Sequence, residues 1–123
     1  MKGIFVNDDG SVKYATEIVN ARKPVETRTK NMLAALVGER AAIVKTGRGC
    51  KPTVIGFTDV VSATLRSGEW LDQNRDLTLI PKGSKYDADG RAKWCYLLEN
   101  AVACDPYPLP GSTVRHGRSW CEF

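Results

Sequence analysis

The segment Ala21–Arg28 is the feature of this chain that most restricts how it can fold. Pro24 lacks a backbone N–H and pushes Lys23 into an extended conformation, so the preceding helix must end here and a strand must begin. Side chains alternate along a strand, which puts Glu26 and Arg28 on one face. Three charged groups therefore meet at one helix–strand junction. A small core cannot bury such groups without partners, so this cluster is the best candidate for a site.

Length and composition predict one globular domain spanning residues 1–123. The chain is 42% apolar and 26% charged, which is typical of a protein with a hydrophobic core. No run approaches the roughly 18 consecutive apolar residues that a membrane span needs, and residues 1–8 turn acidic before a signal peptide could develop. We therefore expect a cytoplasmic protein that makes no contact with a membrane.

The cysteine pattern predicts free thiols and no metal site. Cys50, Cys95, Cys104 and Cys121 include no C-x-x-C pair. Structural zinc sites usually take ligands about two to four residues apart, and no carboxylate–histidine spacing typical of a metal site occurs either. We expect neither a metal nor a cofactor.

Short apolar stretches bounded by turn residues predict five to six strands, at residues 2–6, 24–29, 40–45, 53–61, 93–104 and 118–123. Apolar residues at three- and four-residue spacing predict a helix that Ser11 can cap and that ends before Pro24. Two further short helical segments are predicted, at residues 31–37 and 62–73.

Irregularities in the predicted strands favour a small curved sheet. Gly56 interrupts strand 53–61, which indicates a bulge or a close backbone approach. Strand 93–104 is expected to bend near Glu99 and Asn100. Residues 105–111 contain three prolines and are expected to form an extended connection, because proline cannot donate in a central strand. Several short strands with few helices favour an α+β fold with a small mixed barrel over a doubly wound sheet.

Positive charge is concentrated in one part of the sequence. Residues 22–51 contain eight basic and two acidic side chains, a net charge of +6 within a chain whose total is +4. A basic stripe beside a cleft would attract phosphate groups or RNA. The alternative is that these are solvated charges on strand edges and turns.

Asp59 falls on the same face of its predicted strand as apolar residues. A buried carboxylate there would need a cationic partner, which Arg28 or Lys23 could provide. The alternative is that Asp59 lies at the strand end and reaches water.

Segment Ala21–Arg28 resembles the G-x-K-x-x-E-x-R motif of the ASCH domain family, which has a PUA-like fold. Supporting segments follow in the family's order at residues 38–44, 54–60, 94–100 and 106–110. The resemblance implies a small PUA-like β-barrel flanked by short helices. Ala21 stands where the family usually has glycine, so either Ala21 adopts a strained left-handed conformation or Asn20 takes that role.

The resemblance also implies binding of RNA or a nucleotide, including a modified one, in a cleft. Lys23 would contact a phosphate, Arg28 would make a bidentate contact, and Glu26 would accept from an exocyclic amine or hold Arg28 in place. Unpaired bases stack on aromatic side chains, for which Tyr86 and Trp94 are candidates, although such residues are more often core. The full set of candidate contact residues is Arg22, Lys23, Glu26, Arg28, Lys30, Lys45, Asp59, Tyr86 and Trp94.

A hydrolase acting on RNA or a modified nucleoside is the alternative function. In the acetylcytidine amidohydrolase branch of the family, catalysis is attributed to the motif lysine, a threonine and a distant glutamate. The lysine corresponds to Lys23, but Glu26 stands at the threonine position and the distant glutamate has no assigned counterpart. Lys23 would be nucleophile or general base and Glu26 a proton shuttle. A lysine base needs a lowered pKa, which a nearby carboxylate opposes, so the binding module is favoured.

Overall fold

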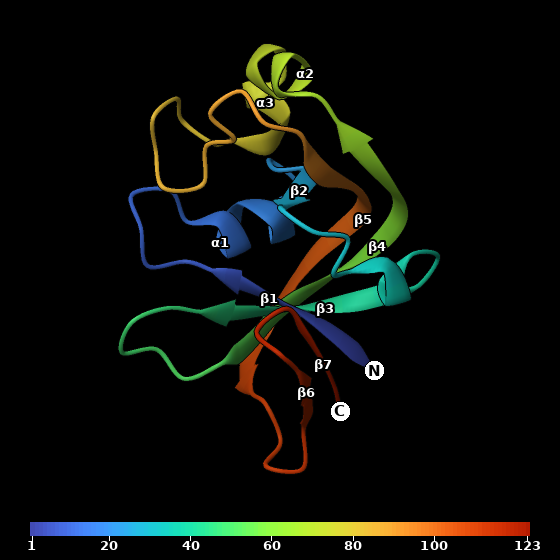
Figure 1. Ribbon diagram of the computed structural model, residues 1–123. Coiled ribbons are helices and arrows are strands. Elements are labelled where there is room, and N and C mark those ends of the chain that lie inside the picture. The colour runs from blue at the N-terminus through green and yellow to red at the C-terminus, as the bar shows by residue number, and fades with distance from the viewer.

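A single seven-stranded sheet organises the computed structural model, which describes residues 1–123 (Figure 1). The strand order is β2-β5-β4-β3-β1-β7-β6, and every neighbouring pair is antiparallel except β1 and β3. The strands are β1 (Lys2–Asn7), β2 (Val25–Arg28), β3 (Arg40–Thr46), β4 (Thr53–Arg66), β5 (Lys93–Pro108), β6 (Val114–His116) and β7 (Trp120–Glu122). The helices are α1 (Tyr14–Val19), α2 (Gly68–Gln73) and α3 (Arg75–Thr78), with a 3₁₀ turn at Ala34–Leu36.

The α+β class is as predicted, but the strand number and the closed barrel are not. Seven strands form instead of five to six, and the edge strands β2 and β6 do not pair with each other. The sheet is strongly bent, with α2 and α3 beside one end of the long strands β4 and β5 and the β6–β7 hairpin at the other (Figure 1). It therefore remains an open sheet.

The main core lies between α1 and one face of the sheet. Tyr14, Ala15, Ile18 and Val19 of α1 are buried, and they join a cluster that includes Ile4 of β1. The opposite face carries a second, smaller cluster around Val44 and Val54. Because side chains alternate along β1, this short strand contributes to both layers. No helix is long and apolar enough to cross a membrane.

Helix α1 is shorter than the sequence predicts at both ends. It begins at Tyr14, and Ser11 is not its cap. The Asp8 carboxylate instead accepts hydrogen bonds from the backbone N–H and the hydroxyl of Thr16, at 3.1 and 2.8 Å. A side chain from the end of β1 thus satisfies a free N–H of the first helical turn. This cap depends on a loop conformation, so it could not be recognised from spacing alone.

At the end of α1, the residue in the left-handed conformation is Ala21. Ala21 has φ of +61°, whereas Asn20 has φ of −90°. The backbone N–H groups of Arg22 and Lys23 both donate to the carbonyl of Glu17, which closes the helix end. The first of the two sequence alternatives is therefore correct, and an alanine occupies a conformation that glycine prefers.

Two predicted boundaries along β4 and β5 are wrong because of strand pairing. Residues 62–66, predicted as helix, continue β4 and pair with residues 93–97 of β5, so the helix is limited to α2. Strand β5 continues through Pro108, which lies opposite Thr53, although residues 105–111 were predicted as a connection. Strand β2 pairs only with residues 94–97 of β5. Pro106 and Pro108 therefore lie in a part of β5 that has a strand neighbour on one side only, where the missing backbone N–H of proline is tolerated.

Other irregularities agree with the sequence. Register shifts flank Gly56, and Asn100 has φ of +53° at the expected bend of β5. The predicted last strand, residues 118–123, is β7, and it forms a hairpin with β6, which was not predicted. All four cysteines are free thiols, as expected.

Candidate ligand-binding pocket

A pocket of about 430 Å³ lies between β1, β2, the start of α1 and the loop that carries Tyr86. It is the size of a site for one small organic ligand. Its charged and polar wall is formed by residues of the helix–strand junction and its remaining walls are mostly apolar or aromatic. The lining residues are Phe5, Val6, Asn7, Tyr14, Lys23, Glu26, Thr27, Arg28, Thr46, Ile80, Tyr86 and Arg118.

Lys23 is buried in the wall of this pocket, with 1% of its side chain exposed. Its Nζ donates to the carbonyl oxygens of Val25, at 2.8 Å, and Thr78, at 2.5 Å, and lies 3.4 Å from Oε1 of Glu26. The Nζ also lies 5.2 Å from the ring centre of Tyr14. Three acceptors surround the three N–H groups of an ammonium, so this arrangement suits the protonated form. The donors of Lys23 are thus directed at protein acceptors, and the phosphate contact predicted for it stays a prediction.

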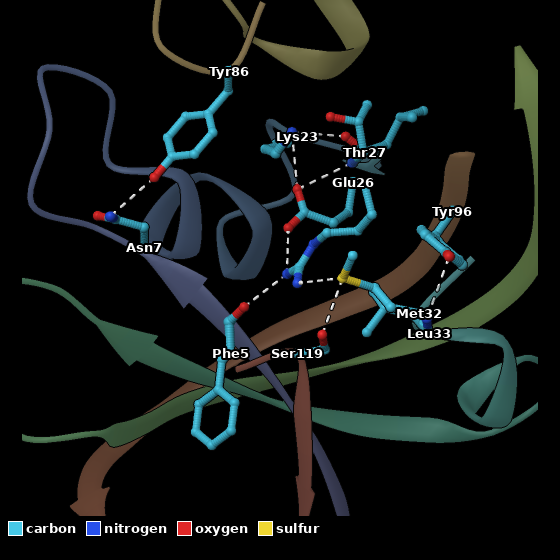
Figure 2. A network of polar contacts seen from close by, with 12 residues as sticks. Phe5, Asn7, Lys23, Glu26, Thr27, Met32, Leu33, Tyr86, Tyr96 and Ser119 are labelled. Atoms are coloured by element: carbon cyan, nitrogen blue, oxygen red, sulfur yellow. Dashed lines mark hydrogen bonds and ion pairs between the residues drawn. The ribbon is translucent and has the colours of Figure 1, made fainter. Parts of the chain in front are cut away.

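Glu26 lies between two cations (Figure 2). Its Oε2 is 3.0 Å from Nη2 of Arg28, and its Oε1 accepts from the backbone N–H of Thr27 at 3.3 Å. Burial alone would raise the pKa of this carboxyl group, but Lys23 and Arg28 outweigh burial and hold the pKa below its ordinary value. Glu26 is thus an ionised carboxylate in the pocket wall, with lone pairs available to a ligand.

Burial and the carboxylate act on Lys23 in opposite directions. Removal from water lowers the pKa of Lys23, and Glu26 only partly offsets this effect. The expected opposition between the two groups is present, but burial is the larger effect. The surrounding carbonyl oxygens nevertheless favour the ammonium, because a neutral amine would direct its lone pair at an acceptor.

Arg28 connects β2 to β1 across the pocket, although the two strands are not neighbours in the sheet. Its Nη2 donates to the carbonyl oxygen of Phe5 at 2.7 Å and to Glu26, while Nη1 lies 4.0 Å from the sulfur of Met32. Arg28 is therefore a fixed element of the pocket wall rather than a free fork.

Two tyrosines form the aromatic side of the pocket. The rings of Tyr14 and Tyr86 are 5.7 Å apart and nearly perpendicular, at 81°. The side-chain amide of Asn7 donates to the hydroxyl of Tyr86 at 3.1 Å, as Figure 2 shows. This contact ties the Tyr86 loop to the end of β1. A planar ligand can therefore lie against aromatic carbon while its polar edge faces Glu26.

The structure resembles solved ASCH proteins from Zymomonas mobilis. It matches a serine-to-alanine variant with a TM-score of 0.74 and 20% identity, covering 97% of this chain and 84% of that one. A tyrosine-to-phenylalanine variant matches with a TM-score of 0.68 and 23% identity, covering 88% and 75%. Another ASCH structure from the same organism matches with a TM-score of 0.66 and 20% identity, covering 88% and 73%. This chain has the ASCH fold.

The predicted resemblance to ASCH domains is therefore confirmed at the level of the fold, while no family model and no curated protein matches the sequence. Within this ASCH fold, segment Ala21–Arg28 provides the charged wall of the pocket. Of the nine candidate contact residues, the four that line the pocket are Lys23, Glu26, Arg28 and Tyr86. Their contact with a ligand stays a prediction.

The other five candidates lie outside the pocket of the ASCH fold. Arg22 is exposed and pairs with Glu17 at 2.7 Å, and Lys30 is exposed on the turn after β2. Lys45 lies half-buried on β3 and does not line the pocket. Trp94 packs against the main core, as its more frequent role suggested. The basic residues of positions 22–51 thus do not form one stripe beside the pocket.

Asp59 pairs with neither cation of the junction. Its carboxylate accepts from Nη1 of Arg40 at 2.9 Å and from the side-chain amide of Asn100 at 2.8 Å. The side chain is 37% exposed, so the carboxylate reaches water as in the second alternative, but Asp59 lies in the middle of β4 rather than at a strand end. The hydrogen bonds from Asn100 and Arg40 lower the pKa of Asp59.

Sequence reasoning missed several lining residues of the pocket. Asn7 ends β1, Tyr14 begins α1, Ile80 follows α3, and Arg118 lies in the turn between β6 and β7. Each is separated from the Lys23 junction in the chain, and none belongs to a motif. Asn7 alone had a local signal, since it ends an apolar strand before a polar turn.

Proposed function

We propose that this chain binds single-stranded RNA or a nucleotide, and that it takes one base into the pocket around Glu26. The observation that carries the proposal is a buried carboxylate held ionised by Lys23 and Arg28 in the wall of a 430 Å³ pocket. Such a carboxylate can accept hydrogen bonds but cannot donate them. The preferred ligand therefore presents N–H donors on its edge.

The dimensions and the walls of the pocket support a single base rather than a duplex. Sequence-specific recognition of RNA usually takes splayed bases onto aromatic side chains and reads their edges by hydrogen bonds. Tyr14 and Tyr86 provide aromatic surface, and Glu26 provides the acceptor. A base with an exocyclic amine, such as cytosine or adenine, matches this acceptor. Uracil has the O4 acceptor where cytosine has its amine, so in the same orientation it would bind less tightly.

Lys23 and Arg28 have positioning roles in this proposal. Their N–H groups are directed at Glu26 and at the carbonyl oxygens of Val25, Thr78 and Phe5. They keep the carboxylate charged and fixed in one orientation, which reduces the entropy lost when a ligand binds. Phosphate groups of the ligand must then meet other cations, outside the charged wall.

The hydrolase alternative has less support from the geometry. A lysine nucleophile or general base needs a free lone pair, whereas the surroundings of Lys23 suit a protonated ammonium. Glu26 is the one carboxylate among the lining residues, so the pocket has no second carboxylate for the role of the distant glutamate. Incubation of the protein with RNA and with N4-acetylcytidine, followed by chromatography, tests this alternative. Release of cytidine or of shortened RNA, absent with Lys23→Met, would establish it over simple binding.

Calorimetric titration with nucleosides tests the binding proposal. We expect cytidine to bind about tenfold more tightly than uridine, because the wrong ligand leaves the carboxylate facing an acceptor. Glu26→Gln, which can donate as well as accept, should weaken cytidine binding and remove most of the preference. Arg22→Gln is the matched control, since Arg22 is exposed and lies outside the pocket. No binding of any nucleoside or short RNA by the wild-type protein would refute the proposal.

A further inference from the structure

A second hollow, of about 510 Å³, lies directly beside the first, and Tyr86 lines both. Thr29, which follows the pocket residue Arg28, forms one side of it. The other side is the polar segment between α3 and β5, which includes Lys85 and Arg91, together with Lys93 at the start of β5. Because the two hollows share Tyr86, a ligand made of linked units can occupy both at once.

Two cations that form no ion pair line the second hollow. None of the eight ion pairs in the structure involves Lys85 or Arg91, and both side chains are exposed. Lys93 is buried, and its Nζ donates to the carbonyl oxygen of Tyr86 at 2.9 Å. In the first pocket, by contrast, Lys23 and Arg28 are already engaged with Glu26 and with carbonyl oxygens. Arg118, which also lines the first pocket, is exposed and in no ion pair, so the second hollow adds two free cations, Lys85 and Arg91, to that one.

The carboxylates of the second hollow do not cancel this charge. Asp87 accepts from the backbone N–H of Gly83 at 2.7 Å and pairs with Arg75 of α3 at 3.1 Å. Its cationic partner thus lies outside the hollow, although Arg75 also pairs with Asp72 at 2.7 Å. Asp89 is exposed and in no ion pair. The three basic side chains of the hollow therefore outnumber its two carboxylates.

The wall of the second hollow is anchored on both sides. The Asp87–Arg75 pair ties it to α3, and the Lys93–Tyr86 hydrogen bond ties it to β5. Lys85 Nζ lies 5.3 Å from the centre of the Tyr86 ring, so a cation stands over the residue that divides the two hollows. An anion that passes Tyr86 would be near this cation. The hollow is thus a built part of the fold.

We infer that the second hollow is a subsite for the nucleotide adjacent to the one whose base occupies the Glu26 pocket. The phosphodiester that joins the two nucleotides lies beside Tyr86, where Lys85 and Arg91 can contact it. Single-stranded nucleic acids bind in this way, through a basic groove along the backbone and aromatic side chains beside the bases. The inference rests on the proposed function, because it needs a base in the first pocket.

Titration with probes of increasing length tests the inference. The probes are cytidine, its 3′- and 5′-monophosphates, and dinucleotides that place cytidine at either end. The variant is the double substitution Lys85→Ala with Arg91→Ala, and its control is Lys13→Ala with Lys51→Ala. The control removes the same charge from exposed positions that line neither hollow. Thermal unfolding verifies that both variants are folded.

We expect one dinucleotide orientation to bind more tightly than cytidine. In the Lys85/Arg91 variant its Kd should rise by about three- to tenfold, while the Kd of cytidine stays unchanged. Cytidine binding without any gain from a second nucleotide would overturn the subsite alone. Equal losses in variant and control would assign the effect to net charge and would also overturn it. Failure of cytidine to bind the wild-type protein would overturn the proposed function and the subsite together.

Discussion

The Lys23 ammonium lies 3.4 Å from the Glu26 carboxylate, and both groups are almost completely buried. Glu26 has a second cationic partner, Arg28, whereas Lys23 has no other anion within ion-pair distance. The remaining donors of Lys23 are directed at the carbonyl oxygens of Val25 and Thr78. Lys23 thus joins α3 to the start of β2, and its removal affects both elements at once.

Lys23→Met should lower the free energy of unfolding by about 2 to 4 kcal/mol, because two buried carbonyl oxygens lose their donor and Glu26 loses a cation. Urea denaturation measures this change. The control is Arg22→Met, which removes a neighbouring exposed cation and should leave stability almost unchanged. An unchanged denaturation midpoint for Lys23→Met would show that this buried contact contributes little.

Acid should destabilise the protein partly through Glu26. Its folded-state pKa lies below the ordinary value of 4.5, so the contribution of Glu26 to stability is complete above about pH 4.5. As the pH falls from there through the folded-state pKa, the unfolded chain binds the proton first and this contribution is lost. Urea denaturation at a series of pH values should show a shallower acid dependence for Glu26→Gln.

Asp59→Asn provides the comparison for this pH series. Its pKa is also lowered, by hydrogen bonds from Asn100 and Arg40, but its side chain is 37% exposed and screened by solvent. We expect it to change the acid dependence less than Glu26→Gln does. The reverse order would mean that Glu26 is not charged in the folded protein.

Ala21→Gly should stabilise the fold. A non-glycine residue in the left-handed region costs about 1–2 kcal/mol, which glycine would avoid. The greater conformational freedom of glycine in the unfolded chain offsets about 0.4–1 kcal/mol of this gain. A net gain of about 0.5–1 kcal/mol is therefore expected at Ala21, where φ is +61°. Asn20→Gly should give no gain, because Asn20 has φ of −90°. Thermal unfolding of both variants distinguishes the two positions.

Gly56→Ala should destabilise the protein by about 1–3 kcal/mol through overpacking. A Cβ at this position would overlap the carbonyl oxygen of Val102 in β5 and the side chain of Val19 in α1. Gly111→Ala is the matched control, because no atom lies within 4 Å of its added Cβ. Similar melting temperatures for the two variants would contradict the close approach of α1 to the bend of β4.

The helix–strand junction was predictable because its causes are local. Pro24 ends the helix, strand alternation aligns Glu26 with Arg28, and the family motif covers both. The residue that adopts the left-handed conformation before this junction could be predicted as Asn20 or Ala21, because that conformation also has a local cause. What remained open was the partner of each charge, since the carbonyl oxygen of Thr78 lies 55 residues away along the chain.

Predictions based on periodicity or charge count failed where distant pairing decided the outcome. Residues 62–66 have a pattern compatible with a helix, yet their hydrogen bonds with residues 93–97 keep them in β4. The basic residues of positions 22–51 are concentrated in sequence but dispersed in space, because Arg22 and Arg40 pair with separate carboxylates on different elements. A local count contains no information about such partners.

The amino-acid sequence by itself determined the charged junction, the α+β class and the likeness to ASCH domains, because each depends on neighbouring residues or on their order. Only the tertiary structure decided that Tyr86 and Arg118 join this junction in one pocket and that Asp59 and Trp94 do not. The physical reason is that the bend of the sheet brings β1 and β2 together across Arg28 although they are not paired strands. That bend accompanies the register shifts between Val54 and Ser62 in the pairing of β4 with β5.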